Sequence, residues 1–438
     1  MSVLVRGGTL IPLDAGPRTV RGDLLIGGRQ IVGVGKVAAP RDAEVIDASG
    51  CYVMPGLVQT HVHLVQTLFR GLAEDLSLLD WLRTRVWPLE AAHDEASIRA
   101  SARLGVLELL LTGTTTILDM GTSHLGDAVA EELVASGIRA RFGQAMMDAG
   151  DGVPPKLVET TRASIDAATA LIKRWHGHDA GRLQYAYAPR FALSCTRELL
   201  EAVAALSRMG SHLVHTHTNE SATERELIER ATGRAPATYL VEVGVASERA
   251  VLAHAVHLDA AEMGALRDVG AAVTHCPSSN LKLGSGVADV VALRGAGITV
   301  GLGADGAACN NRLDGFEEMR LAVLLARARS GPGALTAWDV LRMATIDGAR
   351  ALHADKEIGS LSVDKRADVI VLDAERLAPG GDEATRIVFG GGSRAVRDVI
   401  VDGQVLVRDG APTRLDPAAV RAAAKEAVPG LMVRSGLA

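Results

Sequence analysis

Eight short apolar runs lie between residues 56 and 305, and longer stretches separate them. Their length and their valine, leucine and alanine content are typical of buried parallel strands. The intervening stretches, such as 95–111 and 197–207, have the periodicity of amphipathic helices. Repeated strand–helix units predict an α/β fold, a closed (β/α)8 TIM barrel. We expect its strands at residues 56–63, 114–119, 139–146, 183–189, 212–217, 250–254, 271–275 and 299–305.

The two ends of the chain share a different pattern. Alternating runs at 3–10, 23–26 and 30–34 are punctuated by a Gly27-Gly28 pair, a hairpin signal. Similar runs return at 368–373 and 396–407, around an Asp402-Gly403 turn. We therefore predict one small β domain from residues 1–55 and 356–438, ending in a helical tail, around a barrel of residues 56–355.

Composition narrows the class of protein. The 438-residue chain has a net charge of −6 with interleaved signs, so no nucleic-acid partner is expected. Cys51, Cys195, Cys276 and Cys309 lie far apart, which predicts free thiols in a reducing compartment. No apolar run reaches the roughly 18 residues of a membrane span, and the N-terminus lacks the pattern of a secretory leader. We expect a soluble cytoplasmic protein without a membrane partner.

Residues that can bind metal gather at the predicted strand ends. The carboxyl ends of barrel strands carry the active site in this fold. Neutral imidazoles with a carboxylate form the ligand set of a hydrolytic Zn²⁺ or Fe²⁺ site. The sequence therefore predicts one convergent site at the barrel mouth. Its candidates are His61, His63, His217, His254, His275 and Asp305.

His61 and His63 stand two residues apart on a predicted strand, so both side chains leave the same face and can bind one ion together. An ordinary pair of core or surface histidines would have the same spacing, and these residues alone do not decide between the two readings. The preceding segment MPGLV, residues 54–58, resembles the one that introduces the first metal pair in the amidohydrolase superfamily.

The chain resembles the cytosine-deaminase-like branch of that superfamily, especially S-adenosylhomocysteine and 5-methylthioadenosine deaminases and s-triazine hydrolases. The resemblance covers nearly the whole chain and implies a barrel with one divalent metal, zinc with iron as the alternative. It also implies a β-sandwich built from both termini. The most specific segments are PGLVQTHVH, RGLAEDLSLLDWLRTRVWPLE, HTHTNE, HAVHL, HCPSSNLKLGSGVADV, GLGADGAACNN and MATIDGARALH.

The resemblance implies a role for each strand-end position. Glu220, three residues after His217, would be the catalytic acid/base, and His254 would contact the water or the developing tetrahedral centre. Asp305 would accept a proton from the water besides binding the metal. The implied metal ligands are His61, His63, His217 and Asp305.

Two further histidines and a missing lysine complete this expectation. Only His217 fits the family's His-x-x-Glu pattern, so we expect His215 to pack below the metal. His275 could orient a neighbouring group or line the pocket. Two-metal members need a lysine at the end of strand four, and residues 184–190 contain none. A single metal with an open coordination position follows.

The implied chemistry is hydrolytic deamination. A divalent metal lowers the pKa of a water molecule from about 15.7 to roughly 7. The hydroxide would attack a ring carbon that carries an amino group, while Glu220 protonates the adjacent ring nitrogen and then the departing amine. His254 would stabilise the negative oxygen. We expect hydrolysis of a carbon–nitrogen bond in a cyclic amidine, with release of ammonia.

Four residues are candidates for substrate binding. Trp81 and Glu90 resemble residues of adenosine-type deaminases that line the pocket and bind ribose hydroxyls. Arg190 stands where those enzymes place a histidine against the purine. Gln144 and the loop at 154–155 stand where they supply arginines for the homocysteine carboxylate. Both departures weaken S-adenosylhomocysteine as the substrate.

We predict deamination of an aminopurine or adenosine-type nucleoside, on the strength of Trp81 and Glu90. One alternative is a guanine, 8-oxoguanine or pterin deaminase, because Arg190 sits in a similar context there, although residues 306–311 do not match. Another is a triazine hydrolase that releases chloride or an alkylamine. A non-catalytic binding module fits least, since the implied ligands and Glu220 are present. The resemblance also implies a homo-oligomer, a dimer or tetramer.

Overall fold

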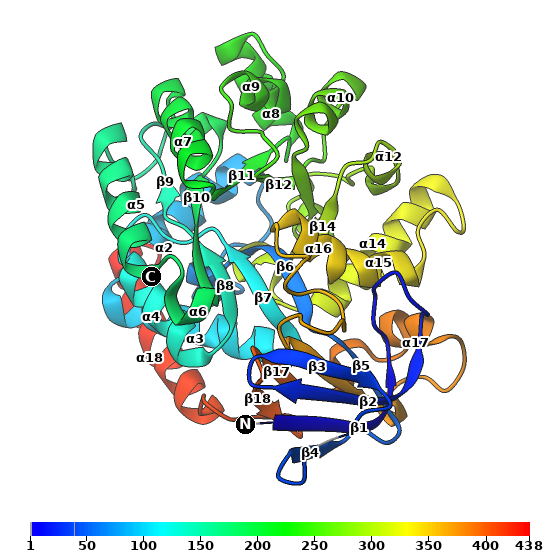
Figure 1. Ribbon diagram of the computed structural model, residues 1–438. Helices are drawn as coiled ribbons and strands as arrows, with labels where there is room; N and C mark the ends of the chain where they lie inside the picture. The colour runs from blue at the N-terminus through cyan, green and yellow to red at the C-terminus, as the bar shows by residue number, and fades with distance from the viewer. Residues whose placement is uncertain (1, 39) are drawn as a thin grey trace.

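Parallel strands close into a barrel in the computed structural model of the chain, which describes residues 2–38 and 40–438 (Figure 1). The last strand pairs with the first through Leu302 and Gln59, which confirms the predicted (β/α)8 topology. The eight positions in order are β6 (Leu57–His63), β7 (Thr114–Asp119), β8 (Arg139–Phe142), β10 (Leu183–Pro189), β11 (Leu213–Thr218), β12 (Ala250–His254), β13 (Ala272–His275) and β14 (Val300–Leu302).

Helices surround the barrel (Figure 1). The predicted helix at 95–111 is α3 (Glu95–Leu111), which begins at an Asp94–Ser97 capping box. The one predicted at 197–207 is α7 (Arg197–Gly210), three residues longer. None of the helices in the described residues is long and apolar enough to cross a membrane. The other main helices are α4 (Gly126–Ser136), α5 (Thr161–Trp175), α8 (Ala222–Thr232), α9 (Pro236–Glu242), α10 (Ala260–Val269), α11 (Pro277–Lys282), α12 (Val290–Gly295), α14 (Gly315–Ser330), α15 (Ala337–Met343) and α16 (Ile346–Ala351).

Two predicted strands are interrupted rather than continuous. The run at 139–146 divides into β8 and β9 (Ala145–Met146) around Gly143. Only glycine fits there, because a Cβ atom would lie 2.4 Å from the carbonyl oxygen of Ala186. The run at 299–305 divides into β14 and β15 (Asp305–Gly306). Asp305 has a φ of +63°, so the chain bends where this carboxylate enters the barrel mouth.

Both termini contribute to one nine-stranded sheet below the barrel (Figure 1). β5 lies between β1 and β16, which joins the N-terminal strands to the C-terminal ones. The predicted hairpin pairs Gly27 with Gln30, and the two parts share an apolar core that includes Val5, Ile26 and Val371. The domain limits proposed from the sequence stay a prediction. The strands are β1 (Ser2–Leu10), β2 (Val20–Gly27), β3 (Gln30–Gly35), β4 (Glu44–Asp47), β5 (Cys51–Pro55), β16 (Val369–Asp373), β17 (Val396–Val401), β18 (Gln404–Arg408) and β19 (Ala411–Pro412).

A buried ion cluster joins this sheet to the barrel. Arg139 on β8 places Nε 2.6 Å from Asp368 Oδ2 and a terminal nitrogen 3.0 Å from Asp402 Oδ1. All three side chains are buried, so each charge depends on its partners. The cluster fixes the small domain against the end of the barrel opposite the candidate site.

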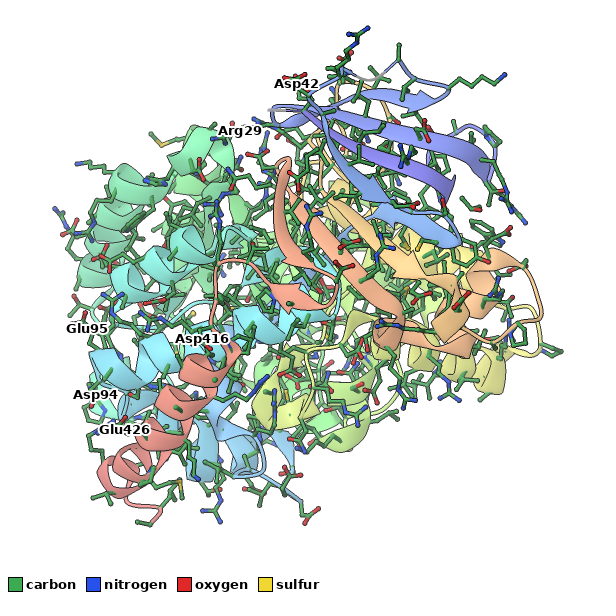
Figure 2. All side chains as sticks on the ribbon, turned by 90° about the horizontal axis from the view of Figure 1, so that it is seen from below. Arg29, Asp42, Asp94, Glu95, Asp416 and Glu426 are labelled. Atoms are coloured by element: carbon green, nitrogen blue, oxygen red, sulfur yellow. The ribbon has the colours of Figure 1, made fainter. Side chains whose placement is uncertain are left out.

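The C-terminal tail is a long helix, α18 (Pro417–Ser435), that returns to the barrel. Figure 2 shows it beside Asp94 and Glu95 at the start of α3. Arg434 pairs with Asp94 at 3.0 Å and donates to the carbonyl of Ala92. Apolar residues of α18, among them Leu431, pack in one cluster with residues of α1 (Leu78–Trp81) and α2 (Trp87–Ala91). The tail therefore supports the segment that covers the barrel mouth.

Candidate metal centre and active site

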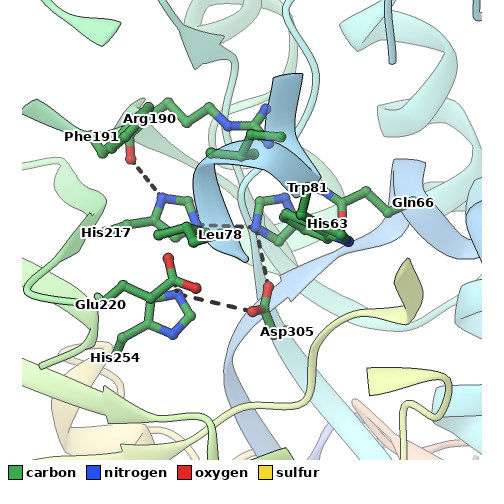
Figure 3. A pocket seen from close by; sticks show the side chains of 11 residues that line it. His63, Gln66, Leu78, Trp81, Arg190, Phe191, His217, Glu220, His254 and Asp305 are labelled. Carbon is green, nitrogen blue, oxygen red and sulfur yellow. Dashed lines mark hydrogen bonds and ion pairs between the residues drawn. The ribbon is translucent and has the colours of Figure 1, made fainter. Parts of the chain in front are cut away.

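A small cavity opens at the carboxyl ends of the barrel strands, beneath α1 and the π-helix η2 (Leu82–Val86). Its volume is about 20 Å³, room for about one water molecule. Figure 3 shows the polar side chains of His63, His217, Glu220, His254 and Asp305 meeting there. The lining consists of His63, Gln66, Leu78, Trp81, Leu82, Arg190, Phe191, His217, Glu220, His254 and Asp305.

Three imidazoles and one carboxylate converge at the base of this cavity. His61 Nε2 lies 3.1 Å and His63 Nε2 lies 3.4 Å from Asp305 Oδ1. His63 Nε2 and His217 Nε2 are 3.2 Å apart, and both belong to a group with His61 whose nitrogens lie within 4.8 Å of one another. Unprotonated nitrogens that face one another so closely suit a shared cation, so the donors fit a divalent metal.

Hydrogen-bond partners of His217 and His61 determine which ring nitrogens face the centre of the cluster. His217 Nδ1 donates to the carbonyl oxygen of Arg190 at 2.6 Å, which leaves the Nε2 lone pair free to bind a cation. His61 Nδ1 lies 2.6 Å from His215 Nε2, on the side away from Asp305. His215 therefore contacts His61 on the side away from Asp305, below the cluster, where the sequence led us to expect it.

Burial and mutual charge favour the protonation states that metal binding requires. Desolvation lowers the pKa of His61, and it lowers the pKa of His63 and of His217 well below the ordinary value. Desolvation would raise the pKa of Asp305, but the adjacent His61 and His254 hold it well below its usual range. Neutral imidazoles beside an ionised carboxylate are the form that binds Zn²⁺.

Glu220 and His254 stand over this cluster. Burial, reinforced by the charge of Asp305, raises the pKa of Glu220 well above its ordinary value, so the carboxyl holds its proton and can act as an acid. His254 Nε2 lies 3.5 Å from Glu220 Oε2 and 3.9 Å from Asp305 Oδ2. His254 Nδ1 donates to Asn280 Oδ1 at 2.9 Å, so in the neutral ring Nε2 carries the lone pair.

Three residues near the strand ends have an uncommon backbone conformation. Asn219, His254 and Asp305 have φ values of +53°, +77° and +63°, a region that non-glycine residues seldom occupy. Each position lies at or just beyond the end of a strand, and at His254 and Asp305 the side chain lines the cavity. Asn219 is held there by Glu262, whose Oε1 accepts from its amide at 2.9 Å. Such strain is typical of functional sites.

The residues predicted to bind substrate lie in different places relative to the cavity. Trp81 lines the cavity, and so does Arg190. Glu90 lies behind them, where Arg190 donates to its two oxygens at 2.6 and 3.2 Å and Gln66 donates at 2.9 Å. Gln144 is not among the residues that line this cavity, and its amide donates to Glu159, so its role in substrate binding stays a prediction.

Several residues of the site were not expected from the sequence. Ser279 donates to Asp305 Oδ2 at 2.7 Å, and Asn280 orients His254. Both lie in the segment HCPSSNLKLG, so their proximity to the strand end at His275 was the available signal. Gln66 and Phe191 follow strand ends in the same way. His275 is buried, and its Nδ1 has no hydrogen-bond partner among residues 2–38 and 40–438.

Known proteins resemble the chain over nearly its full length. A 5′-deoxyadenosine deaminase of Methanothermobacter thermautotrophicus is 40% identical over 93% of this chain and 94% of its own. A 5-methylthioadenosine/S-adenosylhomocysteine deaminase of Halobacterium salinarum is 38% identical over 95% of each. The crystal structure of a zinc-bound adenosine deaminase from Xanthomonas campestris aligns with a TM-score of 0.91 at 30% identity, covering 98% of both chains. The sequence model of the amidohydrolase family matches residues 52–406, and the chain belongs to this family.

Proposed function

We propose that the protein is a metal-dependent hydrolase that deaminates an adenosine-type nucleoside and releases ammonia. The observation that carries this proposal is the buried, proton-bearing carboxyl of Glu220, which faces His254 above the histidine and aspartate cluster. A proton donor next to a site for water activation is what the replacement of a ring amino group requires. The deaminases named above support the same class of substrate.

His61, His63, His217 and Asp305 would hold one divalent ion, with zinc the metal we propose and iron the alternative. Bound there, such an ion would lower the pKa of a water molecule to about 7. The end of β10, where two-metal relatives need a lysine, contains none, in agreement with a single ion. Zinc in the structurally similar adenosine deaminase supports the choice of metal.

The side chains divide the proton transfers among them. Asp305 and His254 are the acceptors closest to the attacking water, because one is ionised and the other presents a lone pair. Once protonated, His254 donates to the oxygen that becomes negative, with the Asp305 carboxylate 3.9 Å away as its counter-charge. Glu220 gives its proton to the ring nitrogen beside the attacked carbon. The Glu220 carboxylate then takes the proton of the new hydroxyl group and passes it to the departing amine, which leaves as ammonia. The proton first taken from the water returns to Glu220 and restores its carboxyl group.

The test is ammonia release from a panel of heterocycles by the zinc-loaded protein. We expect turnover of adenosine, 5′-deoxyadenosine, 5-methylthioadenosine or S-adenosylhomocysteine, and little from guanine, 8-oxoguanine or pterins. Failure to deaminate any adenine nucleoside would refute the proposal. Chloride release from a chlorinated triazine without ammonia from any purine would instead identify a triazine hydrolase.

Two properties complete the proposal. We propose a cytoplasmic location, in agreement with four buried free cysteines and with the absence of a membrane-spanning helix in the described part of the chain. We also propose a dimer or tetramer, which light scattering of the purified protein tests directly. A monomer at micromolar concentration would contradict this.

A further inference from the structure

The catalytic cavity is much smaller than the substrate proposed for it. Its volume is about 20 Å³, room for about one water molecule, whereas pockets that hold small organic ligands measure roughly 300–1,000 Å³. Leu78, Trp81 and Leu82, from α1 and η2, line the cavity, and Figure 3 shows Leu78 and Trp81 beside the histidine side chains. A nucleoside can therefore reach Glu220 only if part of this wall moves.

Unfilled space borders the same segment on its other faces. Leu79 and Arg83 line a second cavity of about 340 Å³, and Leu78 and Leu79 line a third of about 230 Å³. Protein interiors are normally packed without such voids, so a helix inside a core has little room to shift. Both α1 and η2 have that room, and they can move outward without compressing another element.

The movable segment has fixed chain on both sides. Upstream, Glu74 is held by Lys282, whose Nζ lies 2.8 Å from Glu74 Oε1, and Asp75 follows with a φ of +58°. Downstream, η2 is a π-helix that joins α1 to α2, and α2 packs against α18 in one apolar cluster. Turns of π-helix are rare and often occur at functional sites. Residues 75–86 are therefore the part that can move.

Polar contacts between residues 75–86 and the rest of the described chain come from Arg83 alone. Its Nη2 lies 2.9 Å from Asp151 Oδ2, and the two side chains are 37% and 91% exposed. An exposed pair of this kind adds little stability, so it can open and re-form readily. Trp81 has a buried indole nitrogen without a hydrogen-bond partner anywhere in the described residues, and water satisfies it when the segment opens. Burial of the segment's leucines favours the closed position.

We infer that residues 75–86 form a lid over the active site, which opens to admit the substrate and to release the product. On closing, it places Leu78 and Trp81 over the reacting ring, and Arg83 and Asp151 form its latch. The inference rests on the proposed function for the size of the substrate. In the closed position the lid excludes bulk water, so the proton transfers stay within the site.

Thiol labelling of the zinc-loaded protein measures the opening without any substrate. Leu82→Cys places a thiol on the cavity wall, where dithiobis(nitrobenzoate) can reach it only when the lid is open. The native cysteines are all buried, and Cys309 packs in the same apolar cluster as the lid, so they are internal controls. We expect one rapidly reacting thiol per folded chain, and the same for Leu78→Cys. If neither introduced thiol reacts faster than the native ones, or if all thiols react together, the lid does not open locally and the inference is wrong.

Removing the latch gives a graded test. Arg83→Ala, added to Leu82→Cys, should raise the labelling rate about two- to fivefold, the effect of one exposed ion pair on the opening equilibrium. Arg197→Ala is the matched control, because Arg197 forms a similar exposed pair with Glu242 at 2.9 Å outside the lid, and it should leave the rate unchanged. An unchanged rate with Arg83→Ala, or an equal rise with Arg197→Ala, would overturn the latch.

Turnover connects the lid with the proposed function. A short reversible disulfide cross-linker between Arg83→Cys and Asp151→Cys should lower ammonia release from 5-methylthioadenosine at least about tenfold, and dithiothreitol should restore it. The same cross-linker between Arg197→Cys and Glu242→Cys should have no effect. Full turnover with the lid cross-linked would refute the inference. If the protein without substitutions deaminates no nucleoside, the proposed function is wrong, and the labelling experiment still decides whether the lid opens.

Discussion

The ion pair between Arg190 and Glu90 gives the sharpest energetic prediction. Both side chains are buried, with 4% and 8% exposure, and two contacts of 2.6 and 3.2 Å join them. Arg190→Met leaves a buried carboxylate without its cation, which should lower the free energy of unfolding by about 3–5 kcal/mol. Glu90→Gln strands the guanidinium and should have a similar effect. The double variant should lose far less than the sum, since it buries no unpaired charge.

Urea unfolding of the zinc-loaded variants measures this cycle, and metal analysis accompanies it. Arg190 contacts His217 through its backbone carbonyl, so replacing the side chain should leave the metal content unchanged. We expect a coupling energy of at least about 3 kcal/mol between the two positions. If the single effects simply add, or if Arg190→Met stays within about 1 kcal/mol of the unmodified protein, the pair is not the buried, mutually dependent unit described above.

Three further variants test the site. Glu220→Gln should keep its metal but lower kcat by a factor of about 10²–10⁴. The control Glu226→Gln, at an exposed position, should not lower kcat. Equal losses of kcat in the two variants would contradict the acid role of Glu220. Asn280→Ala frees His254 to rotate and should lower kcat about tenfold with zinc retained; an unchanged kcat would contradict its positioning role. Burial and the neighbouring Glu220 raise the pKa of Glu224 from 4.5 to about 7. Between pH 4.5 and 7, Glu224 keeps its proton in the native state but loses it in the unfolded state. The free energy of unfolding therefore falls by about 3 kcal/mol as the pH rises from 4.5 to 7. Glu224→Gln should flatten this dependence in urea unfolding at pH 5 and 8, and a parallel profile would refute the assignment.

The barrel was predictable because its strands are buried on both faces and read as apolar runs. The run ending at His63 and the helix beginning at Glu95 therefore appear in the structure close to where the sequence places them. The breaks at Gly143 and before Asp305 could not be predicted, because they depend on a neighbouring strand's carbonyl and on a left-handed backbone. Neither feature leaves a periodic signal.

The histidine and aspartate cluster was predictable for a similar reason, since parallel strands end at one edge and bring His61 and His217 together. The environment of Glu90 was not predictable from the sequence. Its partner Arg190 is 100 residues away, and only the closed barrel brings the two side chains together. The hydrogen bond from Gln144 to Glu159 could not be predicted either, because it depends on how the segment after β9 folds back.

One divalent ion, held by the histidine and aspartate cluster, would support deamination of an adenosine-type nucleoside. Stepwise zinc addition to chelator-treated protein, with ammonia release from 5-methylthioadenosine measured at each step, tests it most directly. We predict no activity without metal, a linear rise, and a break at one equivalent of zinc per chain. Full activity in the metal-free protein, or a break at two equivalents, would contradict the account.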